Sequence, residues 1–166
     1  MNDNYPDKTA DIAIVMGSRS DWEVMQEATA LPEQLDLSFF TRVVSAHRTP
    51  QRLVEFATGA HERGIKVIIA GAGGSAHLPG MIAAMTPLPV IAVPVPSRHL
   101  NGLDSLLSMV QMPRGVAVST QAIGAAGAFN AGLIATQILA LADTGLSQRL
   151  QDWRRKNSDT VPNEVS

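Results

Sequence analysis

Short apolar runs alternate with helix-like segments along most of the chain, and this alternation limits the folds open to it. Five brief runs end in turn signals and are expected to be strands: residues 11–16, 39–44, 67–70, 90–93 and 116–118. Helices are expected between and after them: residues 20–31, 50–63, 76–85, 102–112, 125–143 and 146–156. Strands that alternate with helices predict an α/β fold, with a parallel sheet covered on both faces and right-handed crossovers.

The length and hydrophobicity fit one domain. The 166 residues are 45% hydrophobic, which is enough to bury a single core, and no repeat or second domain is visible. We expect the domain over residues 11–157. Polar residues at both ends predict a flexible N-terminal tail, residues 1–10, and a flexible C-terminal tail, residues 158–166.

Charge and residue usage argue against several classes of function. A formal net charge of -2 and 4% aromatic residues do not favour nucleic-acid binding. With no cysteine, the chain has no disulfide framework, thiolate metal site or cysteine nucleophile, and it fits a reducing compartment. The polar first ten residues lack the apolar segment of a signal peptide, so we expect a cytoplasmic protein.

Residues 115–142 contain no charged side chain, and a stretch of that length could span a bilayer. Its Ser, Thr, Gln and Asn residues and its many Ala and Gly make it only weakly hydrophobic, so we expect no membrane span. We expect instead a strand followed by a helix that is buried between the subunits of a large oligomer. Four small residues would allow the close approach: Gly124, Gly127, Ala128 and Gly132.

Three loops at the carboxyl ends of the expected strands are the predicted ligand site, because open parallel sheets bind ligands there. The first, residues 17–21, places Gly17, Ser18 and Asp21 at a helix N-terminus, where backbone N–H groups favour an anion. No Gly-Lys-Ser/Thr closes it, so one phosphate or ribose hydroxyls fit better than a triphosphate. A plain turn with an N-cap at Ser20 or Asp21 remains the alternative.

The second loop, residues 45–50, reads Ser-Ala-His-Arg-Thr-Pro. A histidine such as His47 can exchange a proton near neutral pH, and an arginine such as Arg48 can hold a phosphate or carboxylate through paired hydrogen bonds. Thr49 before Pro50 is a good helix N-cap. The alternative is a loop histidine beside a surface charge.

The third loop, residues 71–80, reads GAGGSAHLPG. It fails the dinucleotide fingerprint, because Ala76 occupies the last glycine position and no acidic residue closes the next strand. Its glycines still indicate that backbone comes close to a ligand or to a neighbouring chain. His77 is either a second proton-transfer residue or a helix cap. No metal-ligand spacing or hydrolase elbow is present, and the three loops together suit proton transfer on a small phosphorylated molecule.

Several motifs together resemble one family. They are MGSRSDW at 16–22, SAHRTP at 45–50, GAGGSAHLPGM at 71–81, DSLLSMVQMPRG at 104–115 and AIGAAGAFNAGL at 122–133. The chain resembles the class I N5-carboxyaminoimidazole ribonucleotide mutases of bacterial purine biosynthesis, over about residues 12–154.

The resemblance implies a three-layer αβα sandwich with a flavodoxin-like parallel sheet and a C-terminal helix, assembled as a homo-octamer without metal or organic cofactor. The implied reaction converts N5-carboxyaminoimidazole ribonucleotide to 4-carboxy-5-aminoimidazole ribonucleotide on the path to IMP. An ATP-dependent synthase is the implied functional partner that supplies the substrate.

The resemblance also assigns residues. His47 matches the general acid/base, and His77 lies in the glycine-rich active-site loop. Substrate-binding positions fall on eight other residues of the three loops: Gly17, Ser18, Asp21, Ser45, Arg48, Gly73, Gly74 and Ser75. The chain departs from the usual pattern at Ser75, where alanine is common, and at Ala117 and Ser119. Arg98 and His99 add polarity to a loop near the expected site.

In the implied chemistry, we expect His47 to protonate the departing amine nitrogen and later to remove the proton from the newly carboxylated carbon. We expect Ser18 and Arg48 to hold the phosphate and Asp21 to accept the ribose hydroxyls. The glycine-rich loop would close around CO2 and direct N–H groups at the carboxylate. Two alternatives remain: direct carboxylation of aminoimidazole ribonucleotide by CO2, and a flavodoxin-like module that binds a phosphorylated ligand without turnover.

Overall fold

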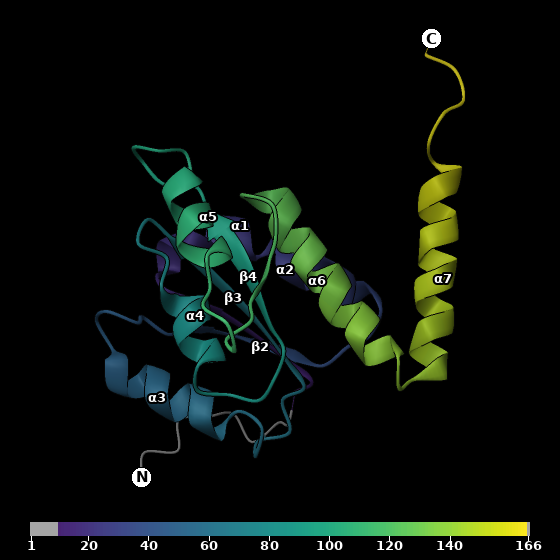
Figure 1. The fold of residues 1–166 in the computed structure, drawn as a ribbon. Helices are drawn as coiled ribbons and strands as arrows, with labels where there is room; N and C mark the ends of the chain where they lie inside the picture. The colour runs from purple at the N-terminus through teal and green to yellow at the C-terminus, as the bar shows by residue number, and fades with distance from the viewer. Residues whose placement is uncertain (1–9, 166) are drawn as a thin grey trace.

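A parallel five-stranded sheet of order β2-β1-β3-β4-β5 forms the centre of the molecule (Figure 1). The structure is a computed structural model that describes residues 10–165. Its strands are β1 (Ile12–Met16), β2 (Phe39–Val43), β3 (Val67–Gly73), β4 (Val90–Val95) and β5 (Ser119–Thr120). This is the flavodoxin-type order, and it confirms the expected α/β fold. The expected N-terminal tail lies outside the described residues except for Ala10.

Helices follow every strand and cover both faces of the sheet. They are η1 (Arg19–Asp21), α1 (Trp22–Met25), α2 (Glu27–Gln34), α3 (Pro50–Gly59), α4 (Leu78–Ala83), α5 (Leu103–Val110), α6 (Ala125–Ala140) and α7 (Thr144–Asp159). Alternate side chains of each strand point to opposite faces. Ile12 and Ile14 pack with α1, α2 and α6, whereas Ala13 and Val15 pack with α3, α4 and α5.

Two sequence-based expectations for these elements are wrong. The fifth strand lies at Ser119–Thr120, where it pairs with Ile91 and Ala92 of β4, and not at residues 116–118. Val118 packs against the core without joining a strand, so its apolar character reflects burial and not pairing. The single helix expected over residues 20–31 is divided into η1, α1 and α2. A cap at Ser18 first winds a 3-10 turn, and Gln26, whose backbone stays helical, separates α1 from α2.

The small residues of α6 pack inside the chain. A Cβ added at Gly132 would lie 2.6 Å from the carbonyl oxygen of Ala28 in α2, and one at Gly127 would lie 1.7 Å from the carbonyl oxygen of Ala122. Gly127, Ala128 and Gly132 are buried. The expectation that these residues serve contact between subunits is therefore wrong for all three, because other parts of the same chain already cover them.

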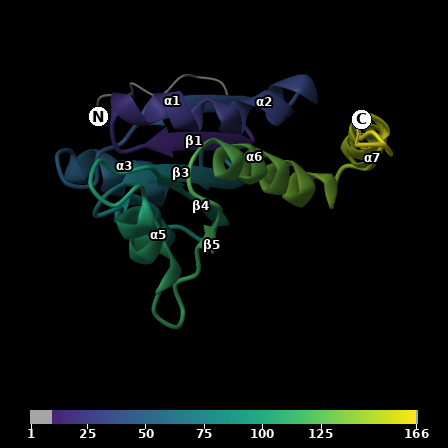
Figure 2. The same ribbon diagram turned by 90° about the horizontal axis from the view of Figure 1, so that it is seen from above.

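The C-terminal helix α7 extends beyond the far end of α6, away from the sheet (Figure 2). Leu146 and Leu150 on its inner face form a buried cluster with Leu31 of α2 and with Leu35, the residue that follows α2. The rest of α7 is largely exposed, and the helix continues to Asp159, past the expected end at residue 156. Within residues 10–165, no helix has the length and hydrophobicity to cross a membrane.

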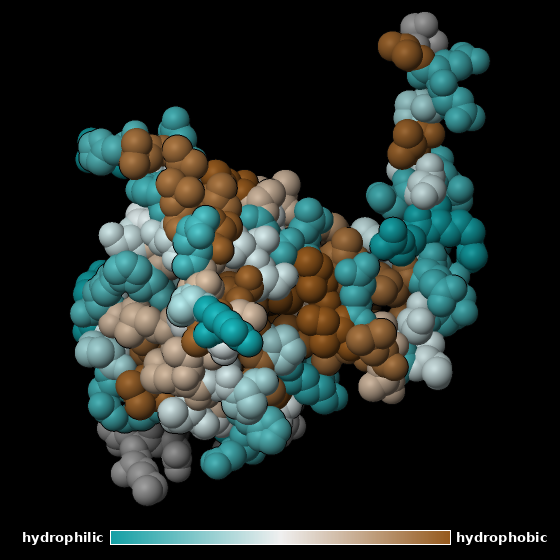
Figure 3. All heavy atoms as spheres, viewed as in Figure 1, coloured by the Kyte–Doolittle hydropathy of each residue, from teal (hydrophilic) through white to brown (hydrophobic). Residues whose placement is uncertain are grey.

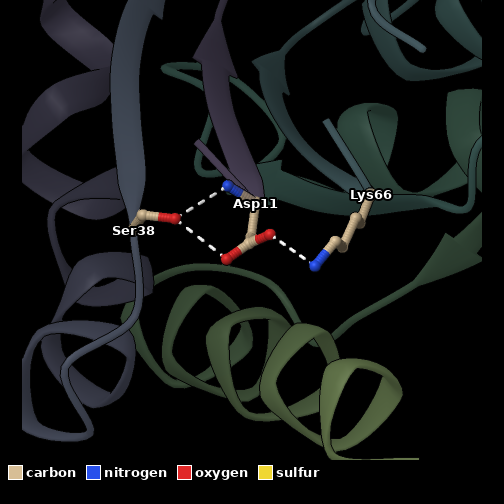
Figure 4. A network of polar contacts seen from close by, with 3 residues as sticks. All are labelled: Asp11, Ser38 and Lys66. Carbon is tan, nitrogen blue, oxygen red and sulfur yellow. Dashed lines mark hydrogen bonds and ion pairs between the residues drawn. The ribbon is translucent and has the colours of Figure 1, made fainter. Parts of the chain in front are cut away.

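Polar contacts join the N-terminal ends of three neighbouring strands (Figure 4). The carboxylate of Asp11, just before β1, accepts a hydrogen bond from the Ser38 hydroxyl at 2.9 Å and an ion pair from Lys66 at 2.8 Å. These side chains precede β1, β2 and β3, so they align the strands at the end of the sheet opposite to the predicted ligand site. The pair is exposed, so its stabilisation is at most about 1 kcal/mol.

Candidate active site

A cleft of about 460 Å³ lies at the carboxyl ends of the strands, where parallel sheets of this order bind ligands. The loops after β1, β2, β3 and β4 form its walls. All ten residues predicted from the sequence line it: Gly17, Ser18, Asp21, Ser45, His47, Arg48, Gly73, Gly74, Ser75 and His77. The strands bring these positions together because their carboxyl ends share one edge of the sheet.

The loop after β1 is closed by a reciprocal capping box. The Ser18 hydroxyl accepts the N–H of Ser20, and the Asp21 carboxylate accepts the N–H of Ser18 at 3.0 Å. The N-cap is therefore Ser18, not Ser20 or Asp21 as expected. The backbone N–H of Asp21 donates to the Ser18 carbonyl at 3.2 Å. Of the four backbone N–H groups at residues 18–21, only that of Arg19 therefore has no protein partner among the described residues. The anion site expected at this helix start thus offers a ligand fewer free backbone N–H groups than predicted.

The carboxyl of Asp21, which lines the cleft, has a clearly shifted pKa. Burial raises the pKa of its carboxyl above the usual value of 3.8, because desolvation disfavours the charged form. Hydrogen bonds from Ser18 and Ser20, and the positive charge of Arg48, act in the opposite direction without cancelling the effect of burial on the pKa. The carboxylate is well placed to accept hydrogen bonds from a ligand whose hydroxyls replace the lost water.

The two candidate histidines are in direct contact although they are 30 residues apart in the chain. Nε2 of His47 lies 2.8 Å from Nδ1 of His77, within hydrogen-bond distance, and the two rings meet edge to face at 88°. His47 follows β2 and His77 follows β3, and because β1 lies between these strands, the two loops reach toward each other across the carboxyl end of β1. Both side chains are exposed to the cleft. A proton on one ring can therefore be shared with the other and with a ligand.

Arg48 is held by its own loop. Its Nη2 donates to the carbonyl of Gly17 at 3.1 Å, and its Nε donates to the hydroxyl of Ser45 at 3.2 Å. The Thr49 hydroxyl donates to the Ser45 carbonyl at 2.9 Å and makes no helix-capping bond, although Thr49 occupies the expected N-cap position. Buried Ser45 thus orients the guanidinium of Arg48, which lines the cleft.

Most backbone N–H groups of residues 74–77, in the glycine-rich loop after β3, already donate to other protein groups. Gly74 donates to the hydroxyl of Ser105, Ala76 to the carbonyl of Gly74 and His77 to the carbonyl of Ser75. The expectation that this loop directs several N–H groups at a ligand carboxylate is therefore wrong for these three. Gly74 needs to be glycine because its φ is +67°.

The cleft also contains residues that were not assigned from the sequence. They are Ala46, Ala72, Leu78, Pro96, Ser97 and Arg98. Arg98 was expected only to add polarity nearby, and it lines the wall formed by the loop after β4. The rule that ligands bind at strand carboxyl ends pointed to this loop too. Among residues 10–165, no three His, Cys, Asp or Glu side chains are grouped as a metal site would require.

The sequence matches the AIR carboxylase family over residues 11–160. The chain belongs to the AIR carboxylase family. It is similar to the N5-carboxyaminoimidazole ribonucleotide mutase of Brucella melitensis, with 60% identity over 95% of this chain and 98% of the relative. The Escherichia coli protein of the same name is also 60% identical, over 92% of this chain and 90% of its own.

Solved structures agree with this family assignment. The crystal structure of Treponema denticola PurE superposes with a TM-score of 0.80 and 25% identity, covering 89% of this chain and 91% of that one. The fold and cleft described above are therefore those of an AIR carboxylase family member.

Proposed function

We propose that this family member is an N5-carboxyaminoimidazole ribonucleotide mutase, an isomerase of de novo purine biosynthesis. The observation that carries the proposal is the hydrogen-bonded pair of His47 and His77 in a cleft that also holds Arg48. Relatives with this name are 60% identical over nearly their full length, which favours the mutase over direct carboxylation by CO2.

The cleft offers a binding group for each part of such a substrate. Arg48 and the Arg19 N–H would hold the phosphate, with the Ser18 hydroxyl beside them. Asp21 would accept hydrogen bonds from the ribose hydroxyls. Ser45 keeps the guanidinium of Arg48 in place, so its contribution to binding is through that side chain.

The reaction needs one proton to be given and taken back. The N–C bond of the carbamate breaks with its electrons left on nitrogen, and His47 supplies the proton, so that aminoimidazole ribonucleotide and CO2 form. The ring carbon then attacks CO2, and the same imidazole removes the proton from that carbon. The enzyme returns to its first protonation state, and no atom is gained or lost overall.

His77 supports this proton transfer through its 2.8 Å contact with His47. The contact holds the two rings edge to face and provides a second nitrogen that can share the proton. Retention of CO2 between the two steps also requires a covered cleft. His47, Arg48 and His77 are exposed in the single chain, so the bound nucleotide and a second subunit are needed as a cover.

A direct assay tests the proposal. Purified protein is incubated with each of the two carboxylated ribonucleotides, and the ultraviolet spectrum is followed for interconversion in both directions. A third sample contains aminoimidazole ribonucleotide and bicarbonate. Rapid interconversion with no bicarbonate requirement supports the mutase. Turnover only in the bicarbonate sample would assign a carboxylase, and binding without turnover would assign a ligand-binding module.

We further infer a homo-octamer in the cytoplasm that receives its substrate from an ATP-dependent synthase. An apolar stripe on and just before α5 supports assembly, because its four members are 45–55% exposed (Figure 3): Leu100, Leu103, Leu107 and Val110. A second copy of the chain is the proposed cover. Gel filtration with light scattering should give about 141 kDa, eight times the 17.6 kDa chain, and a monomer would contradict the assembly.

A further inference from the structure

The glycine-rich loop is tied to α5 by a side chain that does not line the cleft. The Ser105 hydroxyl accepts the N–H of Gly74 at 2.9 Å and donates to the carbonyl of Val95, the last residue of β4, at 2.7 Å. Ser105 is fully buried, with 0% of its surface exposed. One hydroxyl therefore joins the end of β4 to the loop after β3.

Neighbouring side chains of α5 hold the same two walls of the cleft. The Ser108 hydroxyl donates to the carbonyl of Asp104 at 2.7 Å and lies 3.3 Å from the carbonyl of Gly74. The Asp104 carboxylate accepts the hydroxyl of Ser97 at 2.6 Å, and Ser97 itself lines the cleft. The first turns of α5 thus connect residues 73–75 with residues 96–98.

Hydrogen bonds hold the backbone of Gly74. Its φ is +67°, and a Cβ built there would meet no atom within 4 Å. Its N–H donates to Ser105 on α5, whereas its carbonyl accepts the N–H of Ala76 at 2.8 Å within the loop and lies 3.3 Å from the Ser108 hydroxyl. Loss of the Ser105 hydroxyl would leave the Gly74 N–H and the Val95 carbonyl without that partner, and the loop would then move to reach water.

We propose that Ser105 is a positioning residue that keeps the glycine-rich loop closed over the CO2 formed during turnover. This inference rests on the proposed mutase function, in which CO2 exists between two half-reactions. When the loop opens, CO2 escapes in a fraction of turnovers, and aminoimidazole ribonucleotide is released in place of the carboxylated product. Ser105 touches no reacting atom, so its effect is on the partition of the intermediate.

The test is a partition experiment with substrate labelled in its carboxylate carbon. Labelled CO2 and labelled product are counted for the wild type and for Ser105→Ala, after subtraction of the spontaneous loss in enzyme-free buffer. We expect the ratio of CO2 to product to rise about tenfold in Ser105→Ala. Ser108→Ala removes the longer contact to Gly74 and should raise the ratio about twofold to fivefold.

Thr136→Val is the matched control. Thr136 is also 0% exposed, and its hydroxyl donates to the carbonyl of Gly132 within α6, so the variant removes a buried hydroxyl outside the cleft. It should keep the wild-type ratio, because the Gly132 carbonyl still accepts a helical N–H and the loop after β3 is untouched.

Three results separate the possibilities. A wild-type ratio in Ser105→Ala overturns the proposal, and so does an equal rise in Thr136→Val, because general loosening would then explain the leak. If Ser105→Ala does not fold, Ser108→Ala decides, and a wild-type ratio there overturns the proposal. Failure of the wild type to interconvert the two nucleotides would instead reject the mutase function.

Discussion

Gly132→Ala tests whether the small residues of α6 exist for contact with α2 inside the same chain. The added methyl would lie 2.6 Å from the carbonyl oxygen of Ala28 and 3.2 Å from Cδ of Pro32. Because the nearest atom is backbone, α2 must shift as a whole, which places the cost in the upper part of the range for overpacking, about 2–3 kcal/mol. Alanine gains about 1 kcal/mol over glycine in a helix interior. We expect a net loss of about 1–2 kcal/mol in the free energy of unfolding.

Urea unfolding at one fixed protein concentration measures this loss, since assembly also contributes to apparent stability. With a slope of about 2 kcal/mol/M, the midpoint should fall by about 0.5–1 M. Gly80→Ala in α4 is the control, because its added Cβ meets only the flexible end of Met112 at 3.0 Å. It should be neutral or slightly stabilising. A Gly132→Ala protein as stable as the wild type would refute the packing argument.

Three further variants test the cleft. His47→Asn should lower kcat about 10²- to 10⁴-fold but keep nucleotide affinity in calorimetry, and wild-type turnover would remove His47 from its role. Arg98→Ala should raise KM about tenfold with little change in kcat, because the substrate loses a cation; an unchanged KM would show that Arg98 does not touch substrate. Asp21 binds its proton more tightly in the folded state, so its contribution to stability is present at low pH and is lost as pH rises through the raised pKa. Asp21→Asn should therefore be more stable than the wild type to urea at pH 7, with the difference shrinking at acid pH; a constant difference would contradict this.

Local sequence patterns predicted most of the strands and helices. The first four strands and the helices that follow them were expected from apolar runs, turn residues and prolines, and all are present with shifted ends. The fifth strand was misplaced because residues 116–118 are apolar although only Val118 packs against the core, whereas pairing depends on where β4 lies. The pattern of side chains along the chain reports burial and does not distinguish it from pairing.

Three of the four loops that line the cleft could also be predicted, but the loop after β4 and the hydrogen bonds of the site were not. The three loops were identified because parallel strands place their carboxyl ends at one edge. Nothing in the sequence indicated that Gly74 donates to Ser105, which is 31 residues away, or that three N–H groups near Ser18 are already used. These bonds reduce the number of backbone donors that a ligand can meet.

The sequence by itself determined the alternating architecture, the edge at which a ligand binds, and the residue types that face it, because each depends on spacing along the chain. Only the tertiary structure decided the contact of His47 with His77, the attachment of the glycine-rich loop to α5, and the packing of Gly132 against α2. Those depend on distances of a few ångströms between segments far apart in the chain, which are set by how the layers pack and not by the order of residues within any one segment.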